Sequence, residues 1–159
     1  MTSSDERCPG SDFQTGNWRV HHRRLQSRLS GCTEWDAFDG TCEARPILGG
    51  NGNVEDNWLN FPGGALRAVA LRSFDPVDRS WAIWWLDGRY PHTLDVPLIG
   101  RFKDGVGTFF ADDLHDGKAI RLRFLWLDTA TDSPRWEQAM SADGGDTWET
   151  NWTMNFERA

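Results

Sequence analysis

Hydrophobic and polar positions alternate along most of this chain, in segments about ten residues long. In the segment 118–128, Ile120, Leu122, Phe124 and Trp126 share one face, while Arg121 and Arg123 share the other. A period of two is typical of a β-strand with one buried face, and no long stretch has the 3.6-residue period of a helix. The pattern predicts strands at 17–29, 33–48, 53–59, 65–75, 80–89, 98–103, 107–112, 118–128, 134–142 and 147–157.

Short turns rich in Gly, Asp and Pro separate these segments, so each strand is expected to pair with the next as an antiparallel meander. A sheet of ten such strands is expected to close on itself, because closure removes exposed edges. The prediction is an all-β, single-domain, ten-stranded antiparallel up-and-down barrel over residues 13–159. Residues 1–12 are polar and are predicted to form a disordered leader.

Alternation also predicts which side chains face the inside of the barrel. In the last strand, the inward set is Trp148, Thr150, Trp152, Met154 and Phe156. The segment 81–87 is apolar on both faces, which predicts a cover over its outer face, supplied by a loop or by the partner in a homodimer.

One turn has a sequence motif of its own. Residues 141–148 read SADGGDTW, which resembles the Asp-box of sialidases and related propeller proteins. A propeller needs several blades of about 40–45 residues each, and this chain of 159 residues has the box once. We therefore interpret the box as a structural hairpin turn, with Asp143 and the glycines satisfying turn amides and Trp148 folding back over them.

The ends of the predicted barrel resemble those of lipocalins and other calycins. Gly16-Asn17-Trp18 opens the first strand, and Arg158 lies at the end of the last. In lipocalins a Trp in this place plugs one end of the barrel beneath an Arg. From Phe13 to Arg158 the chain also resembles a bacterial family of calycin-like domains without an established reaction, through the stretches GNWRVHHRRL, GCTEWDAFDGTCEARPILGGNGNVEDN, LRSFDP, GRFKDGVGTFFADD and RWEQAMSADGGDTWETNW.

A more distant similarity, to the haem-binding nitrobindins, lacks a counterpart of the haem ligand, because the last two strands contain no His. His92 and His115 are isolated in turns, and Cys8, Cys32 and Cys42 form no C-x-x-C pair. The glycine-rich loop 48–53 lacks the sequence of a phosphate-binding loop and is interpreted as a portal. No cofactor, no metal and no disulfide are expected.

The net charge of −7 and the pI near 5.0 argue against a nucleic-acid partner. The sequence contains no apolar run of the roughly 20 residues that span a bilayer, and its N-terminus does not resemble a signal peptide. A cytoplasmic protein that does not bind membranes is the expectation.

Ten Trp and nine Phe residues against one Tyr indicate either a broad β core or an aromatic-lined lumen, because a Trp N–H is costly to bury without a partner. The predicted ligand-binding residues are aromatic or polar side chains near or inside this lumen: Asn57, Trp84, Trp85, Trp126, Trp136, Gln138 and Trp152. Gln138 is an inward amide in an aromatic wall, suited to orient a ligand.

Four titratable or charged side chains are candidate catalytic groups. His22 and Arg24 are in phase with Trp18 and face inward, His22 as an acid or base or as a core residue. Arg72 is also inward and either forms a structural ion pair, with Asp87 or Glu34 as its expected carboxylate, or anchors an anionic or carbonyl-bearing ligand. Asp87 is either a functional carboxylate or a turn former, and the loop that follows it, YPHTLDVP, is a candidate lid.

Three functions follow from this pattern. The first is binding of a small, largely apolar, ring-bearing ligand in the lumen. The alternative is a cofactor-free cyclase, isomerase or hydratase of specialised metabolism, in which His22, Arg24, Arg72 or Asp87 moves or stabilises charge. The third is a structural dimer whose aromatic side chains fill the barrel.

Overall fold

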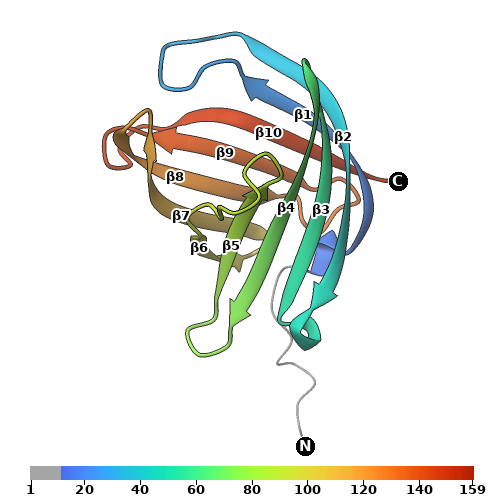
Figure 1. Cartoon of the computed structure of the whole chain (residues 1–159). Helices are drawn as coiled ribbons and strands as arrows, with labels where there is room; N and C mark the ends of the chain where they lie inside the picture. The colour runs from blue at the N-terminus through green and yellow to red at the C-terminus, as the bar shows by residue number, and fades with distance from the viewer. Residues whose placement is uncertain (1–11) are drawn as a thin grey trace, which may run out of the picture.

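The alternating segments of residues 12–159, the part that the computed structural model describes, form ten antiparallel strands that close into a barrel (Figure 1). The strands are β1 (Gly16–Leu25), β2 (Trp35–Ile47), β3 (Gly52–Phe61), β4 (Gly64–Asp75), β5 (Ser80–Asp87), β6 (Leu98–Lys103), β7 (Val106–His115), β8 (Lys118–Leu127), β9 (Arg135–Ser141) and β10 (Glu149–Arg158). Two short 3-10 helices, η1 (Asp12–Gln14) and η2 (Leu48–Gly50), complete the described elements.

Each strand pairs with the next in the chain, and β1 also pairs with β10, so the predicted all-β up-and-down barrel is confirmed. This architecture is consistent with a calycin-like fold. The predicted leader lies outside the described residues except for Asp12, which begins η1. Among residues 12–159, no helix has the length and apolar character needed to cross a bilayer.

The meander puts alternate connections at opposite ends of the barrel. The β1–β2, β3–β4 and β5–β6 connections lie at one end, and the β2–β3 and β4–β5 connections lie at the other, beside η1 (Figure 1). Loop 48–53 belongs to the second group, and none of its residues lines the cavity described below. The interpretation of this loop as a portal is therefore wrong.

The second end of the barrel is closed by Trp18, which is buried beneath Arg158. The guanidinium carbon of Arg158 lies 3.8 Å from the centroid of the Trp18 ring, and its nitrogens donate to the carbonyls of Thr15 and Phe13. Trp18 Nε1 donates to the carbonyl of Gln14 at 2.8 Å. This is the Trp and Arg contact that the calycin resemblance predicts.

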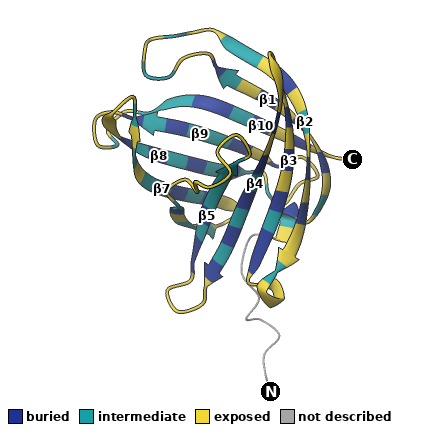
Figure 2. Ribbon diagram, in the orientation of Figure 1, coloured by how far each residue is buried: buried dark blue, intermediate teal, exposed yellow. Residues whose placement is uncertain are grey.

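Burial alternates along most strands, with buried residues on the inner face of the barrel (Figure 2). The last strand departs from the simple pattern because its pairing with β9 shifts between Thr150 and Trp152, leaving Asn151 as a bulge. Trp152, Met154 and Phe156 are buried as predicted.

Trp148 and Thr150, which precede the bulge, do not face inward, so their predicted inward position is wrong. Trp148 packs on the outer face against Phe110 and under Arg123, whose guanidinium carbon lies 4.6 Å from its ring centroid. Thr150 pairs with Ala139, out of phase with the inward Gln138 and Met140. One extra residue in a strand exchanges its faces, and period-two reasoning cannot detect it.

The SADGGDTW turn has the hydrogen bonds of a structural hairpin. Asp143 accepts from the backbone N–H and the hydroxyl of Thr147, and the Ser141 hydroxyl accepts from the N–H of Gly145. Trp148 Nε1 donates back to the carbonyl of Gly145 at 3.0 Å. The motif joins β9 to β10 and stabilises the turn.

Candidate ligand-binding cavity

The barrel encloses a cavity of about 290 Å³. Its wall is mainly aromatic and aliphatic and comes mostly from the inner faces of β4, β5, β8, β9 and β10, with smaller contributions from β3 and β6. The apolar lining residues include Phe61, Leu66, Ile83, Trp85, Leu122, Phe124, Trp126, Trp136, Met140, Trp152, Met154 and Phe156. A lumen of this volume is not filled by the protein's own side chains, so the filled-core interpretation is wrong.

Trp152 is the centre of the aromatic wall. Its ring makes edge contacts with Trp136 at a centroid distance of 5.7 Å and with Trp85 at 6.3 Å. Trp136 in turn contacts Phe124 at 4.8 Å. Rings held edge to face by their neighbours present rigid apolar surfaces to the lumen.

A buried ion pair between Arg72 on β4 and Glu55 on β3 also lines the lumen. Arg72 donates to the Glu55 carboxylate at 2.6 Å and to the amide oxygen of Asn53 at 2.9 Å. Gln14 from η1 donates to the same carboxylate. The prediction that Asp87 or Glu34 would be the partner of Arg72 is therefore wrong, and the pair closes a structural network that reaches the plugged end.

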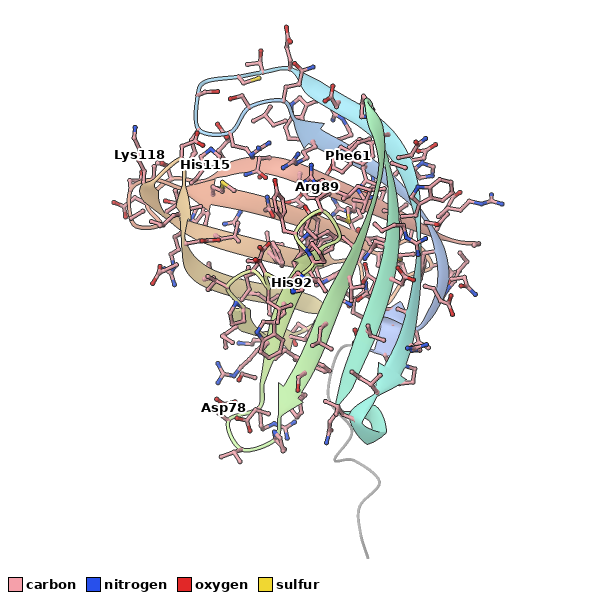
Figure 3. All side chains as sticks on the ribbon, in the orientation of Figure 1. Phe61, Asp78, Arg89, His92, His115 and Lys118 are labelled. Carbon is pink, nitrogen blue, oxygen red and sulfur yellow. The ribbon has the colours of Figure 1, made fainter. Side chains whose placement is uncertain are left out.

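The other end of the cavity is a polar mouth (Figure 3, where Phe61 and Arg89 are labelled). Arg24 from β1 and Asp87 from β5 line it, as predicted for inward residues. Asp87 accepts from Arg89 at 2.8 Å and from the backbone N–H of Arg89, also at 2.8 Å. The Arg89 side chain holds the pKa of Asp87 below its usual value.

The loop 88–97 spans part of this mouth. Leu94 forms a bridge with Leu86, and the N–H of Asp95 donates to the carbonyl of Trp85 at 3.0 Å. Tyr90, Asp95 and Val96 of the loop line the cavity. The position of the loop is therefore that of the lid expected from the YPHTLDVP segment.

His22 is buried but does not line the cavity. Its ring stacks on Phe38 at a centroid distance of 4.7 Å, and its Nδ1 accepts from Trp152 Nε1 at 3.1 Å. Burial lowers the pKa of His22 to about 4, because the loss of hydration outweighs the attraction of Asp39 for the charged form. The structure thus places His22 behind the aromatic wall and in its neutral form at pH 7.

Five of the seven predicted ligand-binding residues line the cavity, and two do not. Trp85, Trp126, Trp136, Gln138 and Trp152 line it. Asn57 is buried on the inner face of β3 outside the lining, with its amide donating to the carbonyl of Glu55. Trp84 pairs with Leu71 on the outer face, and Gln138 donates to Asn151 in the bulge at 2.8 Å.

Sequence reasoning missed several polar residues of the lining. Glu55 lies between Asn53 and Asn57 in a strand whose two faces both carry polar side chains, so alternation gives no inward signal there. Arg89 and Asp95 lie in a loop, where no period applies. Asp113 is in phase with the buried Phe109, which is the signal that could have found it.

Comparison with models of known protein families and with the sequences of curated proteins gives no match for this chain. The evidence for the barrel and for the calycin-like arrangement of Trp18 and Arg158 is therefore the structure alone. Membership of a particular calycin family stays a prediction.

Proposed function

We propose that this barrel binds one small, largely apolar, ring-bearing molecule in its lumen. The observation that carries the proposal is the cavity of about 290 Å³ with its wall of Trp and Phe side chains. An apolar cavity of roughly 150 Å³ takes one benzene ring, so this lumen corresponds in size to a ligand of about two rings. The mouths of β-barrels are frequent ligand sites, and this is also the behaviour that the calycin resemblance implies.

The alternative of a cofactor-free enzyme has less support. Its candidate groups are His22, Arg24, Arg72 and Asp87. His22, the imidazole suited to proton transfer, is separated from the lumen by Trp152. Asp87 is paired with Arg89, and Arg72 with Glu55. A proton-transfer group must reach the substrate, and these contacts favour structural roles for the three candidates.

The test is to fill the lumen and measure binding of a two-ring probe. Ala70 on β4 is buried and lines the cavity, so Ala70→Phe places a ring inside it. Val69 is the neighbouring residue on the outer face, and Val69→Phe adds the same side chain outside. The probe is methyl 2-naphthoate, followed by isothermal titration calorimetry and by quenching of Trp fluorescence.

We expect the wild-type protein and Val69→Phe to bind one probe per chain, and Ala70→Phe to bind none at the same concentrations. Thermal melting of each variant establishes that it is folded. If biphenyl and methyl 2-naphthoate both leave the heat, the fluorescence and the melting temperature of the wild-type protein unchanged, the proposed function is wrong.

A further inference from the structure

Arg24 is a cation in the cavity wall that no carboxylate of residues 12–159 contacts directly. Within residues 12–159 its guanidinium makes no ion pair and no hydrogen bond, and its Nε is buried without an acceptor. The guanidinium carbon lies 5.1 Å from the ring centroid of Trp152 and 5.6 Å from that of Phe61. Two aromatic faces thus fix the fork of Arg24 at the mouth of an apolar lumen.

A partly buried charge of this kind is unfavourable unless an acceptor joins it. Burial lowers the pKa of Arg24 to about 10, and Arg28 and Arg89 add repulsion. Asp87, the cavity carboxylate that favours the charged form of Arg24, is already engaged by Arg89. The N–H donors of Arg24 are therefore available to an acceptor group of a ligand.

We propose that the lumen selects a monocarboxylic acid with a ring-bearing apolar body, whose carboxylate binds the guanidinium of Arg24. This inference rests on the proposed function and names its ligand class. A carboxylate matches the planar fork of an Arg side chain through two parallel hydrogen bonds. With the carboxylate at Arg24, the rings extend between Trp85, Trp136 and Trp152, which line the lumen on the inner side of the mouth.

The remaining charges of the mouth favour a single negative charge on the ligand. Asp95 and Asp113 also line the cavity, and both retain contact with solvent. Asp95 is exposed even though partial burial raises its pKa, whereas the buried Nε of Arg24 has no water-exposed surface. The two carboxylates repel a second negative charge, so a phosphate or another dianion is disfavoured.

The inner end of the lumen adds no second anion site. Arg72 also has a buried Nε without an acceptor, but its terminal nitrogens are occupied by Glu55 and Asn53. The charge of Arg72 is balanced by Glu55 at 2.6 Å. The part of the ligand that reaches this end is therefore expected to be uncharged.

The experiment compares three probes that share one ring system: 2-naphthoate, methyl 2-naphthoate and 2-naphthylmethylamine. Isothermal titration calorimetry at pH 7 measures the Kd of each for the wild-type protein. We expect the acid to bind at least about tenfold more tightly than the ester, as one charge-assisted carboxylate contact provides. The amine is expected to bind more weakly than the ester, because Arg24 repels it.

The variant Arg24→Met keeps most of the alkyl chain and removes the charge. We expect its Kd for the acid to rise to that for the ester, while the Kd for the ester changes by less than about twofold. The matched control is Arg23→Met, which removes the neighbouring Arg of β1 that is exposed on the outer face and does not line the cavity. Arg23→Met is expected to retain the preference for the acid.

The outcomes separate this inference from the proposed function. If the ester or the amine binds the wild-type protein as tightly as the acid, or if Arg24→Met keeps the preference for the acid, the carboxylate assignment is overturned and lumen binding stands. If none of the three probes binds, both the proposed function and this inference are overturned.

Discussion

The indole Nε1 of Trp152 donates a hydrogen bond to Nδ1 of His22 at 3.1 Å, joining the aromatic wall of the lumen to the barrel core behind it. Because Nδ1 accepts, the proton of the neutral His22 ring lies on Nε2. The pair thus requires an uncharged imidazole, which the lowered pKa of His22 provides. Trp152 itself lines the lumen, so this contact positions a wall residue for ligand binding.

The first prediction concerns acid stability. His22 has a pKa of about 4 in the folded protein, against 6.5 when unfolded, so the unfolded state binds the extra proton between these values. The contribution of His22 to the free energy of unfolding is therefore fully present above pH 6.5. It falls by about 3 kcal/mol as the pH drops toward 4. Gln accepts the Trp152 hydrogen bond without titrating, so His22→Gln should weaken this pH dependence in urea unfolding.

His21 provides the control, because it neighbours His22 and faces solvent. A hydrogen bond to Asp39 raises the pKa of His21, so its stabilisation is present below pH 6.5 and is lost as the pH rises through its folded pKa. The variant His21→Gln should therefore still lose unfolding free energy between pH 6.5 and pH 4, because His22 is intact in it. An unchanged slope in His22→Gln between pH 4 and 6.5 would contradict the assignment.

The second prediction compares two ion pairs that join the same strands on opposite faces. Arg72–Glu55 faces the lumen with both side chains buried, and Arg67–Asp56 faces solvent with both exposed. Arg72→Met should reduce the free energy of unfolding by about 3–5 kcal/mol, since it leaves Glu55 charged and buried. Arg67→Met should cost less than about 1 kcal/mol. Urea unfolding measures both, and equal costs would refute the difference in burial as the cause.

The third prediction separates the plugged end of the barrel from the mouth. Arg158→Met removes the cation above Trp18 and two hydrogen bonds to backbone carbonyls. We expect a loss of about 1–2 kcal/mol in unfolding free energy. The Kd for methyl 2-naphthoate should stay within about twofold of wild type, because neither residue lines the cavity. A large change in that Kd would mean that the two ends are coupled.

The fourth prediction concerns the β9–β10 turn. Hydrogen bonds from Thr147 and Ser141 hold the pKa of Asp143 well below its usual value. The resulting stabilisation is present above the unfolded pKa of about 3.9 and is lost as the pH falls below it. Asp143→Asn should lower the melting temperature at pH 7 and leave ligand binding unchanged. Asp146→Asn, in the same turn, is the charge-matched control and should melt closer to wild type.

The sequence predicted the barrel because alternation and turn residues are local signals. Ile120, Leu122 and Trp126 face inward, as their period of two requires. Short turns make consecutive strands antiparallel neighbours in the sheet. The inward position of Arg24 followed in the same way from its phase with Trp18.

What alternation cannot supply is register and irregularity. The ion-pair partner of Arg72 depends on the register between β3 and β4. That register places Asn53 opposite Arg72, and it is set by the turn between the two strands. The outward position of Trp148 depends on the bulge at Asn151. The separation of His22 from the lumen depends on the Trp152 ring, whose orientation is a result of packing.

The most direct test of lumen binding is a crystal structure with methyl 6-bromo-2-naphthoate, grown from protein that calorimetry shows to be saturated. We expect one bromine peak in the anomalous difference map inside the barrel, among Trp85, Trp136 and Trp152. A bromine peak on the outer face, beside Ile99 and Phe110, with an empty lumen would contradict this expectation.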